Sequence, residues 1–134
     1  MIDLSPDVFK AAIAEARLAP SVHNVQPSRW HLAGDRLKLL GDPSRSIPVA
    51  DPAGRDWRLS HGAHFEGLSL ALAARGARLV DIRMQPAQSV SLELVPIAEC
   101  AVVFDAGRLP QEPVSARMSW RCSSRLSADT FAIA

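Results

Sequence analysis

The chain has 134 residues, of which 48% are hydrophobic, and a formal net charge of +1 from 15 basic and 14 acidic residues. This length suffices for one domain that buries roughly two thirds of its unfolded surface. The balanced charge, without a basic block, argues against nucleic acid and anionic membranes as partners. The N-terminus lacks a signal-peptide pattern, and no apolar run approaches the ~20 residues that span a bilayer. We therefore expect a soluble, cytoplasmic protein.

A helix is predicted over residues 5–18, because Ser5 can cap its first turn and Pro6 suits the first helical position. Apolar residues then recur at helical spacing until Pro20 ends the run. The segment that follows, APSVHNVQPSRW (residues 19–30), places polar side chains between two prolines. Because the prolines fix the backbone, we interpret this segment as a rigid presenter of hydrogen-bonding groups.

Two strands are predicted near residues 28–33 and 36–40, joined by a turn at the Gly-Asp pair between them. A proline-rich loop follows, and Asp51 with Pro52 repeats the cap-plus-proline signal of a helix start. From there to Gly76, apolar residues lie on nearly every side of the predicted helix. This pattern indicates a central, buried helix.

Three segments after this helix are rich in β-branched residues and alternate in part between apolar and polar positions, which favours strands. They are ARLVDIRM (77–84), SVSLELVP (89–96) and ECAVVFD (99–105). A short helix is predicted near residues 113–121. The pattern indicates an α+β domain with a central buried helix packed on a mostly antiparallel sheet. Because the chain ends on apolar residues without a closing element, we expect a single domain over residues 1–134 that is truncated at its C-terminus.

The common catalytic and metal-binding templates do not occur in the sequence. The residues around Ser60 lack the glycines of a nucleophile elbow, and there is no glycine-rich phosphate loop of either common type. His61 and His64 lack a third ligand, so we interpret them as structural residues rather than as a zinc site. Cys100 and Cys122 are too few and too far apart for a disulfide framework, and we expect buried or incidental thiols.

A second polar cluster, RCSSR, places Arg121 and Arg125 on either side of serine hydroxyls, including that of Ser123. Arginine forks and hydroxyl groups are suitable ligands for a phosphate. The same composition is also typical of a solvated surface, so this motif alone does not decide between the two interpretations.

Taken together, the segment APSVHN-QP after a helix, the DPAGR helix start and RCSSR resemble the nitroreductase superfamily of FMN-dependent flavoproteins. The resemblance covers about residues 5–127 and is strongest to the Acg-like branch, in which two nitroreductase-like halves are fused in one chain. It implies a nitroreductase-like α+β fold, FMN as the cofactor, and a homodimer or a complementing second half. This chain looks like the first half only.

The resemblance also implies which residues bind the cofactor. In this family, one loop reaches across a dimer or pseudo-dimer interface toward the flavin, and its matching residues here are Pro20, Ser21, Val22 and Asn24. Residues matching Arg121 and Ser123 hold the FMN phosphate. The residue matching Arg125 lies near the flavin N1–C2=O edge, where a cation stabilises the negative charge of the reduced ring. No catalytic residue is assigned, because the segments near flavin N5 would lie in the missing half.

The function implied by the resemblance is that of an FMN-dependent oxidoreductase, which passes a hydride from NAD(P)H to flavin and then reduces a nitro-aromatic or quinone-like acceptor. Two alternatives stay open: a flavin-binding or sequestering module without turnover, and an inactive truncated remnant. FMN binding with or without donor oxidation separates the first two, and absence of binding indicates the third. Gly62 and Gly67 of the central helix would allow close packing either at an interface or in the core.

Surface ion pairs are expected beside the proline-rich loop. Arg45 is predicted to pair with Asp42, and Arg55 with Asp51. Such exposed pairs contribute about 0–1 kcal/mol each.

Overall fold

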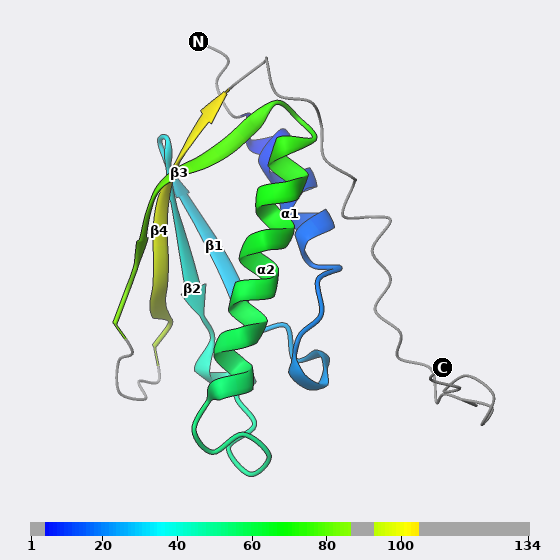
Figure 1. Ribbon diagram of the computed structural model, residues 1–134, viewed down its shortest axis with the longest axis vertical. Coiled ribbons are helices and arrows are strands. Elements are labelled where there is room, and N and C mark those ends of the chain that lie inside the picture. The colour runs from blue at the N-terminus through cyan, green and yellow to red at the C-terminus, as the bar shows by residue number, and fades with distance from the viewer. Residues whose placement is uncertain (1–4, 87–92, 105–134) are drawn as a thin grey trace, which may run out of the picture.

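The computed structural model describes residues 5–86 and 93–104, which form two helices, two short 3-10 turns and a four-stranded sheet. In chain order the elements are α1 (Pro6–Ala16), η1 (Val22–Asn24), β1 (Ser28–Ala33), β2 (Arg36–Gly41), η2 (Pro43–Arg45), α2 (Arg55–Ala73), β3 (Ala77–Met84) and β4 (Val95–Phe104). The strand order is β1-β2-β4-β3, with every neighbouring pair antiparallel. Both helices lie on the same side of this sheet (Figure 1). The predicted α+β architecture is confirmed.

Helix α1 begins where the sequence predicts. The Ser5 hydroxyl accepts a hydrogen bond from the backbone N–H of Val8 at 3.3 Å, and Pro6 lies in the first turn. The residues of α1 that are buried against the rest of the fold are Phe9, Ala12 and Ala16. Their spacing matches the apolar face that the sequence pattern indicates.

Helix α2 begins later than the sequence signal suggests, at Arg55, after Gly54 with φ of 63°. The Asp51 carboxylate nevertheless accepts hydrogen bonds from the backbone N–H groups of Arg55 and Trp57, each at 2.8 Å. Burial by itself would raise the pKa of Asp51, but these N–H donors of the first helical turn hold it below its ordinary value. Asp51 therefore caps the first turn of α2, as predicted, although it lies four residues before the helix begins at Arg55. The left-handed Gly54 lets the chain turn back toward it.

Among the described residues, the sheet differs from the prediction at the break expected between residues 96 and 99. The hairpin of residues 28–33 and 36–40 matches β1 and β2, and residues 77–84 form β3, so these predictions are confirmed. Strand β4, however, continues through the gap that was expected between residues 89–96 and 99–105. A register shift opposite the bond between Leu39 and Leu40 changes which residues of β4 face the helices. This β-bulge breaks the alternation of apolar residues without ending the strand. Residues 87–92 and the predicted helix at 113–121 lie outside the described residues.

The core lies between the helices and the sheet. The largest fully buried side chains of the core include Leu37, Leu39, Leu68, Leu72 and Cys100. Two glycines allow α2 to approach its neighbours closely. A Cβ atom on Gly67 would lie 3.3 Å from the Cα atom of Ala16, and one on Gly41 would overlap the Trp57 ring and lie 2.8 Å from His61 Nε2. Gly67 therefore has a core role between the helices, whereas Gly62 is exposed and faces open space.

The sheet face that points away from the helices is charged. Arg36 forms ion pairs with Asp81 at 2.7 Å and with Glu99 at 2.9 Å, which links β2 to both β3 and β4. Within the described part of the chain, no helix is long and apolar enough to cross a membrane.

We predict that Gly41→Ala destabilises the fold, because the added methyl group forces the Trp57 ring and His61 out of their packed positions. Overpacking of this kind costs about 1–3 kcal/mol. Urea denaturation measures the free energy of unfolding. Gly62→Ala is the matched control, because a methyl group at this position meets nothing within 4 Å. Replacing a glycine inside a helix by alanine should stabilise the fold by about 0.5–1 kcal/mol. Equal stability of the two variants would contradict the close approach at Gly41.

Candidate functional site

The loop between α1 and β1, residues 20–26, has an unusual backbone and is called the presenting loop below. Three of its residues other than glycine adopt left-handed conformations: His23 with φ of 44°, Asn24 with 57° and Gln26 with 48°. Asn and His adopt this region more often than most residues do, but Gln rarely adopts it. Such conformations cost of order 1–3 kcal/mol each and persist only where the surroundings hold them.

Hydrogen bonds hold the presenting loop in this shape. The backbone N–H of Val22 donates to Ser60 Oγ of α2 at 2.8 Å, and the Ser60 hydroxyl in turn donates to the carbonyl of Asp56 at 2.8 Å. Within the loop, the N–H of Gln26 donates to Ser21 Oγ at 3.1 Å. The loop is thus closed on itself and fixed to the first turns of α2.

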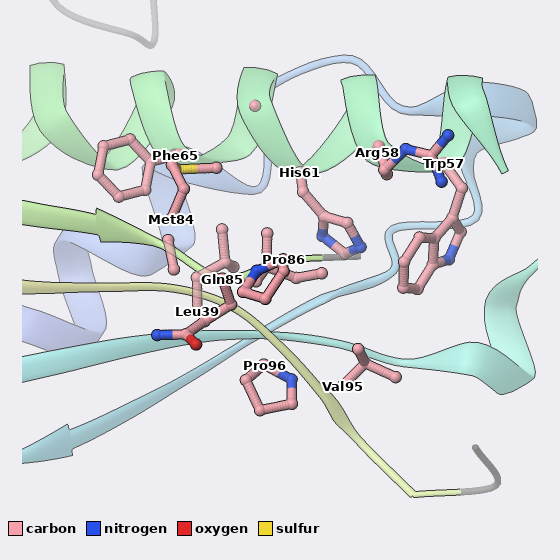
Figure 2. A pocket seen from close by; sticks show the side chains of 13 residues that line it. Leu39, Trp57, Arg58, His61, Phe65, Met84, Gln85, Pro86, Val95 and Pro96 are labelled. Carbon is pink, nitrogen blue, oxygen red and sulfur yellow. The ribbon is translucent and has the colours of Figure 1, made fainter. Parts of the chain in front are cut away.

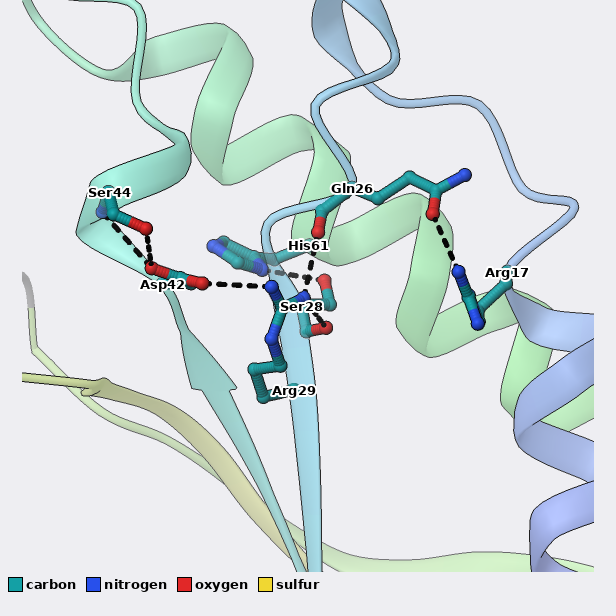
Figure 3. A network of polar contacts seen from close by, with 7 residues as sticks. All are labelled: Arg17, Gln26, Ser28, Arg29, Asp42, Ser44 and His61. Carbon is teal, nitrogen blue, oxygen red and sulfur yellow. Dashed lines mark hydrogen bonds and ion pairs between the residues drawn. The ribbon is translucent and has the colours of Figure 1, made fainter.

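Two consecutive hydrogen bonds between side chains determine which polar group of the loop is left for a ligand. Arg17 donates to Gln26 Oε1 at 3.3 Å (Figure 3), and Gln26 Nε2 donates to Asn24 Oδ1 at 3.3 Å. A guanidinium group can only donate, so it fixes the orientation of the Gln26 amide, which then fixes that of Asn24. The exposed Asn24 therefore offers its Nδ2 group as a hydrogen-bond donor.

The presenting loop borders an open groove of about 390 Å³ on the surface of α2. The residues that line it are Pro20, Ser21, Val22, Asp56, Leu59, Ser60 and Ala63. Three of the residues predicted to bind a cofactor therefore come together here, and Asn24 follows them in η1. Leu59 is 62% exposed and gives the groove an apolar wall. Arg121, Ser123 and Arg125 lie outside the described residues.

A second, apolar cavity of about 250 Å³ lies between α2 and one end of the sheet, where Trp57 and His61 point from the helix toward the strands (Figure 2). The rings of these two residues meet edge to face with centroids 4.3 Å apart. Behind the cavity, Ser28 Oγ and His61 Nδ1 form a buried hydrogen bond of 2.8 Å. The sequence offers no signal for this contact, because its partners lie on a strand and a helix that are distant along the chain.

The two histidines of α2 are neutral. Burial, reinforced by the neighbouring His64, lowers the pKa of His61 to about 4. Burial also lowers the pKa of His64 to about 4, with Arg17 and Arg29 contributing. Their interpretation as structural residues agrees with their burial. Among the residues that the structure describes, no group of three or more His, Cys, Asp or Glu residues could hold a metal ion.

Among the described residues, neither of the ion pairs expected beside the proline-rich loop forms. Asp42 pairs with Arg29, not with Arg45, at a distance of 2.8 Å (Figure 3). The antiparallel register of β1 and β2 brings Arg29 beside the residue that follows β2, which the spacing of charges along the chain does not reveal. Asp51 binds Arg55 through the backbone N–H rather than the guanidinium group.

The sequence is similar to two curated proteins of Mycobacterium tuberculosis (strain ATCC 25618 / H37Rv). "Putative NAD(P)H nitroreductase acg" is 29% identical over 119 residues, which cover 88% of this chain and 36% of that protein. "Putative NAD(P)H nitroreductase Rv3131" is 34% identical over 70 residues, which cover 52% of this chain and 20% of that protein. The chain thus spans about a third or less of the length of these relatives. No protein-family model matches it.

Solved structures share the fold at low sequence identity. A crystal structure named as a "Putative NADH Oxidase" from Clostridium acetobutylicum has a TM-score of 0.63 and 15% identity, covering 78% of this chain and 80% of that one. A nitroreductase family protein from Streptococcus pneumoniae TIGR4 has a TM-score of 0.56 and 17% identity, covering 97% of this chain and 90% of that one. The predicted nitroreductase-like fold is confirmed.

We predict that the free energy of unfolding falls as the pH is lowered from about 7 to about 4. Unfolded histidine titrates near 6.5, whereas His61 and His64 have pKa values of about 4 when folded, so the unfolded chain binds more protons in this window. Each shift corresponds to roughly 3 kcal/mol, which is fully present above pH 6.5 and is lost as the pH falls toward 4.

Urea denaturation at several pH values measures this dependence. Asp42 and Asp81 have pKa values below their ordinary 3.8, so their stabilising effect is lost only at lower pH. His64→Gln should reduce the slope of stability against pH, whatever its effect on absolute stability. A free energy of unfolding that does not change across the window would show that the two histidines are not buried as neutral groups.

Proposed function

We propose that this chain binds FMN and takes part in the NAD(P)H-dependent reduction of a nitro-aromatic or quinone-like acceptor. The reason is that the chain belongs to the nitroreductase superfamily. The names of its relatives support an NAD(P)H-dependent oxidoreductase. The observation that carries the proposal for this chain is the strained presenting loop, held against α2 by Ser60.

The described residues fit one edge of a flavin ring. The ring carries carbonyl oxygens and ring nitrogens that accept hydrogen bonds, and the Asn24 Nδ2 group is a fixed donor. Pro20 and Leu59 supply apolar surface against which a flat ring can pack. Strain in the loop supports a binding role, because residues held in rare conformations cluster where a ligand is clamped.

The proposed phosphate site comes from RCSSR. Arg121 and Ser123 would hold the FMN phosphate through charge-assisted and hydroxyl hydrogen bonds. Arg125 would lie at the pyrimidine edge of the ring, where its charge favours the reduced cofactor. Bound FMN supplies the hydride chemistry, and this chain supplies binding, orientation and electrostatic stabilisation.

We propose that the site is completed by a second copy of the chain or by a complementing half. The presenting loop and the exposed Leu59 border an open groove on the surface of α2, so a ligand placed there would still have one side uncovered. A partner that packs on this surface would enclose the ligand. Exclusion of water strengthens the electrostatic interactions that the site offers.

We predict that the protein quenches flavin fluorescence when it is titrated with FMN, and that Arg121→Ala and Arg125→Ala each weaken binding. Loss of a charged hydrogen bond reduces affinity by about tenfold or more. Lys38→Ala, on the charged face of the sheet, removes one positive charge elsewhere and serves as the control. Absence of binding by a folded, dimeric sample would refute FMN as the cofactor. Binding without oxidation of NAD(P)H would instead favour the sequestering module.

We further predict that Asn24→Asp weakens FMN binding by about tenfold while the fold keeps its stability. The substitution preserves the acceptor for Gln26 Nε2 but removes the exposed Nδ2 donor. Fluorescence titration measures the affinity, and thermal unfolding measures the stability. Asn24→Ser, which keeps a donor and an acceptor, should retain more affinity than Asn24→Asp. Equal affinity of Asn24→Asp and the unaltered protein would contradict the donor role of this residue.

A further inference from the structure

A third pocket lies on the other side of the presenting loop, where α1, β1, η2 and α2 converge. Its volume is about 410 Å³, which is within the usual range for small-molecule sites. The residues that line it are Ile13, Arg17, Gln26, Ser28, Arg29, Trp30, Arg45 and His64. Only Gln26 also belongs to the presenting loop, and none of these residues lines the groove of the proposed flavin site.

The pocket carries an excess of positive charge. Three guanidinium groups line it, from Arg17 just after α1, Arg29 of β1 and Arg45 of η2. Asp42 neutralises one of them through its ion pair with Arg29. Among the described contacts, Arg45 has no hydrogen bond or ion pair, although it lies near enough to help lower the pKa of Asp42. Arg17 uses one donor on Gln26 and keeps others for a ligand, because a guanidinium group has five N–H bonds.

Two aromatic residues that line the pocket have buried ring nitrogens without a hydrogen-bond partner among the described residues. His64 is 6% exposed, and its Nε2 atom has no hydrogen-bond partner among the described residues. The same holds for Nε1 of Trp30, whose ring centroid lies 6.1 Å from that of His64. A buried polar group without a partner costs free energy, and an indole N–H can only donate.

We infer that this pocket binds a small organic anion, in which a phosphate or carboxylate group meets the arginines and a compact apolar or aromatic body lies against Ile13 and Trp30. The volume exceeds what a bare oxyanion fills, and the pocket wall is divided between charged and apolar side chains. Arginine side chains bind phosphate and carboxylate groups with the same bidentate geometry. The inferred ligand is therefore defined by an oxyanion group joined to a compact apolar or aromatic group. The inference goes beyond the proposed flavin site and does not depend on it.

The experiment is an NMR titration of the full chain that follows the assigned indole N–H resonance of Trp30. The probes are phenyl phosphate, benzoate and the neutral benzyl alcohol. We expect saturable shifts with one or both anions and none with benzyl alcohol. Stronger binding of phenyl phosphate identifies an organic phosphate as the preferred ligand, and stronger binding of benzoate identifies a carboxylate. Either result supports the site.

Variants at two arginines locate the binding. Arg45→Gln and Arg17→Gln should each weaken anion binding by about tenfold or more. Arg45 lies on an exposed turn, so its variant stays informative even where Arg17→Gln perturbs the loop. Lys38→Gln, on the opposite face of the sheet, should leave binding unchanged. The inference is overturned by three results: no saturable shift in a folded sample, equal affinity for benzyl alcohol, or equal affinity in the Arg45→Gln and Lys38→Gln variants.

Discussion

The close packing of α2 against α1 and the sheet is the constraint on which the other features depend. It leaves little room for a side chain at Gly67, where α1 crosses, and none at Gly41, where the Trp57 ring rests on β2. With the helix fixed in this way, neighbouring residues of α2 serve different sites. Ser60 anchors the presenting loop, and His61 binds Ser28 beside the apolar cavity. About one turn later, His64 lines the cationic pocket, which is the pocket that contains Arg17, Arg29 and Arg45. A shift of α2 by a fraction of a turn would disturb all three together.

Local signals in the sequence predict the elements of the fold well, whereas contacts between distant segments are not predictable from it. Ser5 with Pro6 marks the start of α1, and a glycine turn marks the β1–β2 hairpin, because each signal acts within a few residues. The continuity of β4 depends on a bulge opposite Leu39, which only the pairing of strands can show. For the same reason the pairing of Arg29 with Asp42 escapes an analysis based on charge spacing.

The conformation of the presenting loop is predictable only in part. Two prolines around short polar residues indicate a rigid loop, and in the structure the residues at its start border a groove. The left-handed backbone at Gln26 has no signature in its residue type, since it is held by a hydrogen bond to Ser21 in a loop that Ser60 anchors to a distant helix. Tertiary contacts thus override local preference at the positions where a ligand would be held.

Arg17 connects the presenting loop to the cationic pocket. A guanidinium group cannot accept a hydrogen bond, so its contact with Gln26 imposes one direction on the amides that follow, ending at the donor of Asn24. A lysine at this position could also donate, but its flexible ammonium would not bind the amide and a pocket anion in one fixed geometry. The planar fork of Arg17 can serve both because its five donors point in different directions from a single plane. The polarity of the loop and part of the positive charge of the pocket therefore come from the same side chain, that of Arg17 at the end of α1.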